Sequence, residues 1–294
     1  MNDATVVCFG EVLWDIFPDK KVMGGAPLNV ALRLHSLGVN TKIISRVGKD
    51  ANGHTVFQYL EDGGLSTALV QEDEQLKTGE VLVALDHQGN ASYEISKPVA
   101  WDAIGLTPIM VSQVKNAPFF LFGSLALRGT PNIRTMRELL SVARTKIFDV
   151  NLRAPHYHIS MVYELMQIAN VIKVNDEELE ILCSELGCQA IEMKERALWL
   201  EQVTKTHTIC ITRGAEGALL LHLGKFYEHG GFKIEVEDTV GAGDSFLATL
   251  VKELFILEHD PKSSLRRACA MGALVASRDG ANCKVSSSEV DSLL

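Results

Sequence analysis

The sequence is short of positive charge. Its 294 residues include 28 lysines and arginines against 37 aspartates and glutamates, which gives a formal net charge of −9 at pH 7. Proteins that bind nucleic acid or anionic membranes by general electrostatic attraction need a basic surface, so this balance argues against both partners. A small anionic ligand remains open, because its site needs only a few local donors.

Long hydrophobic runs and secretion signals are also missing. No apolar run approaches the ~18 residues of a membrane span, and residues 1–5 carry no positive charge ahead of a hydrophobic segment. The six cysteines form no CxxC pair, and most of them lie in apolar segments. We therefore expect reduced core thiols in a cytoplasmic protein.

Several familiar catalytic motifs are absent. Gly48-Lys49 and Gly224-Lys225 lack the following Ser or Thr that completes a P-loop. The sequence contains no HExxH and no GxSxG, so the zincin and α/β-hydrolase signatures are excluded.

What is present is a regular alternation of short apolar runs with amphipathic stretches. Buried strands are predicted at residues 6–9, 42–47, 119–122, 147–150, 171–174 and 209–212. Helical patterns lie at residues 27–37, 56–60, 132–143, 176–186, 191–203, 245–257 and 265–277. This order predicts an α/β fold, a three-layer sandwich in which helices cover both faces of a mostly parallel sheet.

One region departs from that rhythm. Residues 79–85 and 91–95 alternate polar and apolar side chains around a predicted turn at 87–90, which is typical of an exposed antiparallel hairpin. Residues 12–22 are similarly strand-like. Because no repeat or linker divides the chain, we expect one domain over 1–294, with a small β-sheet lid formed by about 12–22 and 79–100.

The strongest local signal is the segment DTVGAGDSF at 238–246, directly before an apolar helix. Its glycines allow a tight turn, and a helix start offers unpaired amides and the positive end of the dipole. Gly241, Ala242 and Gly243 could thus form an anion hole for phosphoryl charge. Asp244 could accept the proton of an attacking hydroxyl. The same segment could instead be a plain strand-to-helix turn.

A second glycine-rich turn, GGAPLNVA at 24–31, also precedes a predicted helix. Gly25 allows close approach of the backbone to a ligand, and Asn29 offers a donor and an acceptor to a polyol. Asp15 comes soon after the first strand, at the edge where open α/β sheets bind ligands, and could accept two sugar hydroxyls. A structural cap at 24–31 and a solvated loop carboxylate at Asp15 are the alternatives.

Three further polar clusters, at 149–153, 173–178 and 212–217, follow predicted strands. Polar groups at successive strand ends indicate one crevice along the sheet edge. Glu178 could hold Mg²⁺ through water, since Mg²⁺ prefers a few oxygen ligands and keeps part of its water shell. Asn175 could instead cap the following helix.

Taken together, GGAPLNVA with the later Leu37-Gly38 and DTVGAGDSF resemble the N- and C-terminal signatures of the ribokinase-like (PfkB) carbohydrate kinases. The resemblance implies the ribokinase-like fold, ATP and Mg²⁺ as cofactors, and ATP-dependent phosphorylation of a free sugar hydroxyl. It implies that Asp244 is the base and that the amides of 241–243 form the anion hole. Asp15, Gly25 and Asn29 would hold the sugar.

The resemblance also assigns nucleotide and ion contacts. Asn175 and Glu178 would organise Mg²⁺ and the phosphates; Thr212, Gly214 and Gly217 would line the nucleotide phosphates; Gly280 and Asn282 would lie in the loop beside the adenine. Members often bind a monovalent cation near Asp238, Val240 and Gly280, but Lys284 stands where a small hydroxyl residue is common, and its ammonium could replace K⁺. The lid would close on the sugar and could also pair two subunits.

The sequence features that bear on substrate specificity favour two different substrates. GEVLWDIFP at 10–18 and PVAWD at 98–102 resemble bacterial fructokinases, which implies D-fructose as substrate and adds Trp101 to the sugar contacts. The segment DVNLR at 149–153 also resembles 2-keto-3-deoxygluconate kinases, in which the arginine, here Arg153, would meet a carboxylate. A non-catalytic sugar- or nucleotide-binding regulator is a third hypothesis. Asp244 beside an intact GAG turn argues against it, because a binder needs no base.

Overall fold

The computed structural model describes residues 4–85 and 91–294. Within this range the main sheet has nine strands in the order β13-β12-β11-β10-β9-β8-β1-β4-β5. Strands β11, β10, β9, β8, β1, β4 and β5 run parallel, and β12 and β13 are antiparallel additions at one edge. The strands are β1 (Thr5–Phe9), β4 (Asn40–Gly48), β5 (Val70–Asp73), β8 (Phe119–Gly123), β9 (Thr145–Asp149), β10 (Val171–Asn175), β11 (Thr208–Thr212), β12 (Ala218–His222) and β13 (Lys225–His229).

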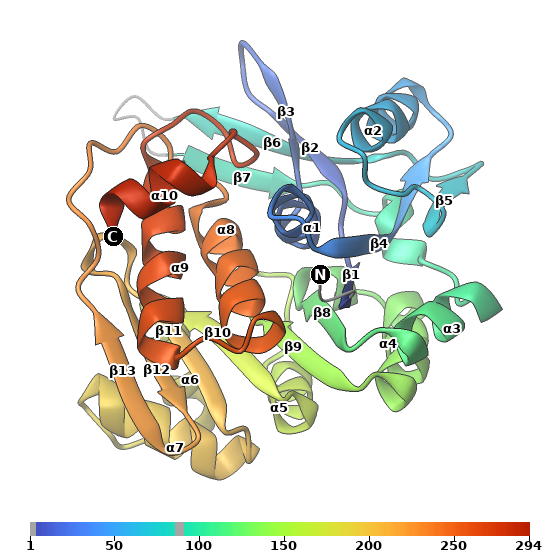
Figure 1. Ribbon diagram of the computed structural model, residues 1–294. Coiled ribbons are helices and arrows are strands. Elements are labelled where there is room, and N and C mark those ends of the chain that lie inside the picture. The colour runs from blue at the N-terminus through green and yellow to red at the C-terminus, as the bar shows by residue number, and fades with distance from the viewer. Residues whose placement is uncertain (1–3, 86–90) are drawn as a thin grey trace.

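Helices cover both faces of this sheet (Figure 1). On one side lie α1 (Ala26–Ser36), α2 (Ala51–Asp62), α8 (Ala242–Leu250) and α9 (Pro261–Ala276), with α10 (Ser287–Leu293) packed on α9. On the other lie α3 (Pro108–Asn116), α4 (Thr130–Val142), α5 (Ile159–Ile168), α6 (Asp176–Leu186) and α7 (Met193–Thr204).

Two separate apolar clusters account for the three layers. Val7 and Phe9 of β1 pack into the cluster that includes residues of α3 to α7, whereas Val6 and Cys8 pack into the cluster under α1, α2 and α8. Successive strand residues point to opposite faces, so a strand covered on both sides must be apolar throughout. The prediction of a three-layer α/β sandwich is confirmed.

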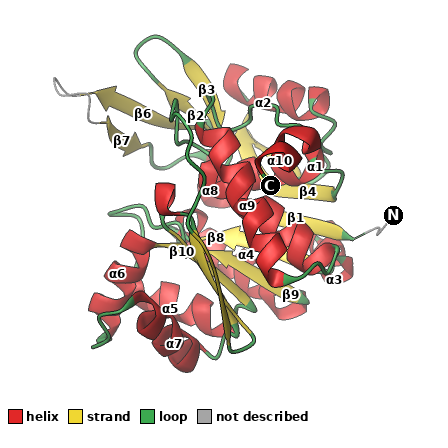
Figure 2. Ribbon diagram, turned by 60° about the vertical axis from the view of Figure 1, so that its left-hand side comes forward, coloured by secondary structure: helices red, strands yellow, loops and turns green. Residues whose placement is uncertain are grey.

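A second, four-stranded sheet has the order β3-β2-β6-β7 and stands apart from the main sheet (Figure 2). It contains β2 (Leu13–Ile16), β3 (Lys21–Gly24), β6 (Gly79–Leu85) and β7 (Ala91–Ile95). β2 is antiparallel to β3 and parallel to β6, and β6 is antiparallel to β7. The turn predicted at 87–90 lies outside the described residues.

Several boundaries differ from the sequence-based expectation. The helix predicted at 245–257 is α8 followed by a π-helical turn, Val251–Ile256. The strands β5, β12 and β13 and the helices α3, α5 and α10 lie outside the predicted elements. In the described ranges no helix is both long and apolar enough to cross a bilayer. All six cysteines have free thiols.

Candidate active site

The two glycine-rich turns lie at the N-termini of α1 and α8, two helices that pack against each other. Gly25 caps α1 with a φ of 113°, and a Cβ at this position would lie 2.3 Å from the carbonyl oxygen of Glu11. Gly241 caps α8 with a φ of 73°, and a Cβ there would lie 2.3 Å from the Cβ of Ala281. Only glycine fits both positions without strain. The packing of the two helices therefore brings both turns to one place.

Asp244 occupies the first turn of α8 and meets Asn29 from α1. The Asn29 Nδ2 donates a hydrogen bond to the Asp244 Oδ2 at 2.8 Å. Burial raises the pKa of Asp244 to about 6, and the charge of Asp149 adds to the rise, while Asn29 and Lys173 oppose it. Such a carboxyl is still ionised at neutral pH, and it accepts a proton more readily than an ordinary aspartate, as a general base requires.

A buried ion pair lies next to this turn. The Lys173 Nζ is 3.0 Å from the Asp149 Oδ1, and the two residues are direct partners on β10 and β9. The same Nζ is 3.6 Å from the position that a Cβ on Gly243 would occupy. Burial opposes the charge of Lys173, but Asp149, Glu178 and Asp244 together hold its pKa above the ordinary value. A fixed ammonium thus stands beside the amides at the start of α8.

Those amides complete an anion-binding arrangement. The first amides of a helix have no intrahelical acceptor, and the helix dipole adds partial positive charge. The Ala242 amide donates to the Thr239 carbonyl at 3.3 Å, a long hydrogen bond. The turn at 241–243 and Lys173 together form a site suited to phosphoryl charge, with Asp244 beside it.

Two more carboxyls and one arginine extend the site toward the second sheet. Burial raises the pKa of Asp15 on β2 to about 6 and the pKa of Glu11 to about 7. The charge of Arg153 lowers the pKa of Asp15, Glu11 and Asp244, so its guanidinium acts on all three. Glu11 is only 2% exposed, and its Oε2 has no hydrogen-bond partner among the described residues.

The family model for the pfkB carbohydrate kinases matches residues 4–287, nearly the whole chain. The chain belongs to the pfkB family of carbohydrate kinases. It is 29% identical to fructokinase-2 of Solanum lycopersicum over 311 residues, covering 95% of this chain and 92% of the relative. The family and this relative identify an ATP-dependent sugar kinase.

Solved structures show the same fold. A fructokinase from Xylella fastidiosa with bound ATP superposes with a TM-score of 0.86 at 25% identity, covering 100% of this chain and 98% of the other. A fructokinase from Vibrio cholerae O395 with fructose, ADP and potassium bound gives 0.85 at 24% identity, covering 100% and 99%. The expected ribokinase-like fold is thereby confirmed.

Asn175 and Glu178, the two kinase residues expected at Mg²⁺ and phosphate, form the N-terminal cap of α6. The Asn175 Oδ1 accepts from the Glu178 amide at 2.7 Å, and the Glu178 Oε2 accepts from the Asn175 amide at 2.9 Å. The Glu178 Oε1 accepts from the Leu152 amide at 2.7 Å, and Thr212 is the direct neighbour of Asn175 on β11. Both glutamate oxygens are thus engaged, so a water-mediated Mg²⁺ contact would use their remaining lone pairs.

The expected nucleotide-binding glycines differ in their surroundings. At Gly214 an added Cβ would meet no atom within 4 Å, so this backbone is open to a ligand. At Gly217 it would lie 2.1 Å from the His229 carbonyl oxygen, so the absence of a side chain there serves the packing of 229–231. The amide of Gly280 donates to the Asp238 carboxylate at 3.1 Å.

One expected contact needs correction. Trp101 is completely buried, and the Arg128 guanidinium lies 4.0 Å from its ring centroid. Because it presents no surface to a ligand, it belongs to the core and not to the sugar site. Asn282, expected in the loop beside the adenine, donates from its Nδ2 to the Asn29 Oδ1 at 3.1 Å, so its amide also faces the residues around Asp244.

Sequence reasoning gave no role in the site to Lys173 or Glu11, although Lys173 begins the polar cluster at 173–178. A lysine inside the otherwise apolar strand VIKVN was a usable signal, because a charge in a strand buried on both faces requires a partner. Glu11 gave no such signal, since a glutamate after a strand is usually solvated.

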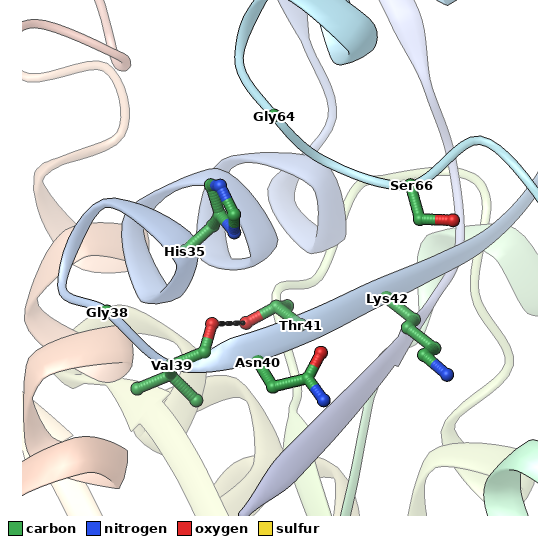
Figure 3. Close-up of a pocket in the computed structure, with 8 residues that line it drawn as sticks. All are labelled: His35, Gly38, Val39, Asn40, Thr41, Lys42, Gly64 and Ser66. Atoms are coloured by element: carbon green, nitrogen blue, oxygen red, sulfur yellow. Dashed lines mark hydrogen bonds between the residues drawn. The ribbon is translucent and has the colours of Figure 1, made fainter. Parts of the chain in front are cut away.

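A surface cavity of about 320 Å³ lies elsewhere (Figure 3). It is lined by residues at the C-terminal end of α1 and the beginning of β4, including His35 and Lys42. Asp244 and Asn29 lie near the opposite end of α1, so this cavity is separate from the candidate active site.

Proposed function

We propose that this chain phosphorylates D-fructose to fructose 6-phosphate with ATP. The observation that carries the proposal is the Asn29–Asp244 hydrogen bond at the start of α8, with Lys173 beside the same turn. Asp244 would take the proton from the sugar hydroxyl while the hydroxyl oxygen attacks the terminal phosphorus of ATP and ADP leaves. The amides of 241–243 and the Lys173 ammonium would stabilise the charge on the transferred phosphoryl group.

The carboxylate oxygens near this turn also suit a divalent cation as ligands. Asp149 Oδ2 is buried and has no hydrogen-bond partner among the described residues, and Glu178 lies close enough to raise the pKa of Lys173. We propose that Glu178 holds Mg²⁺ through water while Asn175 orders the phosphates. Bound Mg²⁺ would neutralise phosphate charge. Thr212, Gly214 and Gly217 remain the proposed lining of the nucleotide phosphates.

A monovalent cation is proposed where the loop before α8, which carries Asp238, meets the loop after α9, which carries Gly280. The two oxygens of Asp238 accept hydrogen bonds from the amides of Val240 and Gly280 at 2.9 and 3.1 Å, which ties the two loops together at this carboxylate. Lys284 is exposed. Activity in KCl compared with choline chloride at equal ionic strength tests the ion, and equal rates would support replacement by Lys284.

Substrate choice rests on Asp15 and Arg153. At ~4 Å and an effective dielectric constant of ~20, Asp15 would repel a sugar acid by about 4 kcal/mol before screening, which offsets a single arginine contact. Neutral hydroxyls instead gain charge-assisted hydrogen bonds from Asp15. Arg153 would then brace the carboxyl cluster or contact phosphate.

A coupled assay of ADP release with a panel of sugars tests the substrate. We expect kcat/KM for fructose to exceed that for 2-keto-3-deoxygluconate by at least ~10²-fold, which requires only ~2.7 kcal/mol. Asp15→Ala should raise KM for fructose strongly. A preference for the sugar acid that Arg153→Ala selectively abolishes would establish the alternative kinase. Absence of sugar-dependent ADP release would favour a regulator.

The second sheet is the proposed lid of a single domain that spans the chain. β2 carries Asp15 and follows β1 after a short connection. Because Asp15 is a proposed sugar contact, movement of the second sheet would change the position of this contact. We also propose that the sheet pairs two subunits through its edge, which sedimentation analysis would test, and that the enzyme works in the cytoplasm, where its free thiols stay reduced.

A further inference from the structure

The loop at 280–283 is fixed against both helices of the active site. The Arg33 Nη2 donates to the Cys283 carbonyl at 2.9 Å, and its Nε donates to the Ser245 Oγ at 3.0 Å. Arg33 is 4% exposed, so these bonds are shielded from water. Gly241 packs directly on Ala281. The loop that carries Asn282 is therefore part of the rigid support of α1 and α8.

The side chain of Asn282 fixes which way round the Asn29 amide lies. An amide has one accepting end and one donating end. Asn282 Nδ2 donates to the Asn29 Oδ1 at 3.1 Å, and Asn29 Nδ2 donates to the Asp244 Oδ2 at 2.8 Å. With its oxygen held by Asn282, Asn29 presents its NH₂ group to Asp244. The reversed amide would set two acceptors against each other at Asp244 and two donors at Asn282.

Asn282 also interacts with a residue of a third helix. The Asn282 side chain also interacts with Tyr59 on α2, where it opposes the rise that burial causes in the pKa of the phenol. The side chains thus form a chain of contacts from Tyr59 through Asn282 and Asn29 to Asp244. Three helices and one loop contribute to it, and Asp244 lies at its end.

We propose that Asn282 is a positioning residue, which orients the Asn29 amide so that its NH₂ group donates to Asp244 and keeps this carboxylate ionised. The proposal rests on the proposed function only in naming Asp244 as the base. In this role Asn282 acts through Asn29, whose amide it orients toward Asp244.

The direction of the effect follows from the charges around Asp244. The other charged groups that face it are Asp149 on β9, Lys173 on β10, Arg153 after β9 and Glu11 after β1. Burial and Asp149 raise the pKa of Asp244, and the Asn29 hydrogen bond lowers it. Loss or reversal of the Asn29 amide should therefore raise the pKa further, while the four charged neighbours stay in place.

The titration of Asp244 can be followed without any catalytic assay. The ligand-free protein is labelled with ¹³C at the aspartate carboxyl carbons, and the Asp244 signal is assigned by its loss in Asp244→Asn. Asn282→Asp should raise the Asp244 midpoint by about one pH unit, and Asn282→Ala by less. Asn282→Ser, which keeps a hydroxyl donor, should stay nearest to the wild type.

A double-mutant comparison separates positioning from simple charge repulsion. In an Asn29→Ala background, Asn282→Ala should leave the Asp244 midpoint unchanged, and Asn282→Asp should shift it only by the Coulomb effect of the new carboxylate. Equal shifts with and without Asn29, or no shift with Asn29 present, would overturn the proposal. Thermal unfolding of each variant checks that it is folded.

Kinetics distinguish this role from contact with the nucleotide. Asn282→Ala should change KM for ATP by less than about twofold. As the pH is lowered, kcat of this variant should begin to fall at a higher pH than kcat of the wild type. A rise in KM for ATP of more than ~5-fold with an unchanged Asp244 titration would return Asn282 to the nucleotide site. If the titration shifts but no sugar is phosphorylated, the positioning role stands and the proposed function fails.

Discussion

Replacement of Asp244 by asparagine should make the protein more stable and nearly inactive. The ordinary pKa of an aspartate, 3.8, is raised to about 6 at this position, chiefly by burial. At a pH between these two pKa values the folded protein keeps a proton on Asp244 that the unfolded chain has released. The free energy of unfolding therefore falls as the pH rises from about 4 to about 6. Above pH 6 the full cost of an ionised Asp244 is present.

The size of this cost follows from the shift. About two pKa units correspond to up to about 3 kcal/mol at pH 8, and because Asp244 keeps some exposed surface this is an upper value. An asparagine side chain at this position cannot ionise, but its amide oxygen still accepts the Asn29 hydrogen bond. Asp244→Asn should therefore gain up to about 3 kcal/mol at pH 8 and roughly half of that at pH 5. The same change should lower kcat by roughly 10²–10⁴-fold, because it removes the proton acceptor.

Urea unfolding at pH 5 and pH 8, together with the coupled assay, measures both effects. Asp176→Asn, an exposed change in the first turn of α6, is the matched control and should shift stability only slightly at either pH. A gain that is equal at the two pH values would refute the burial argument. Retention of more than a tenth of the wild-type kcat would refute the assignment of Asp244 as the base.

Three further outcomes are expected. In the wild type kcat should fall with a slope of one below about pH 6, as Asp244 becomes protonated; a rate that is constant down to pH 5 contradicts this. Saturating fructose should slow amide hydrogen exchange in β2 and β6 but not in the distant β13, and equal exchange in all three would reject closure of the lid. Lys173→Met should lower kcat by ~10²-fold or more and destabilise the fold by about 3–5 kcal/mol, since Asp149 is left buried without a partner. Adding Asp149→Asn should restore stability but not activity, and recovery of activity would make Lys173 purely structural.

Much of the fold could be predicted because its signals are local. The bounds of α6 match the prediction at 176–186, where an asparagine cap, an acidic first turn and a final glycine mark both ends. Strands covered on both faces are apolar throughout, which identified the parallel part of the sheet. The strand β12, ALLLH, was missed because a short apolar run fits a helix or a strand equally well. Its pairing with β11 decided between them.

The sequence by itself marked Asp244, Asn29 and both glycine turns, because such backbone geometry requires glycine and such chemistry requires a carboxylate beside it. Only the tertiary structure decided their neighbours. The packing of α1 on α8 joins Asn29 to Asp244, and pairing of β9 with β10 places Asp149 against Lys173. These contacts join residues far apart in the chain or on separate strands, so no local pattern encodes them, and burial alone removed Trp101 from the sugar site.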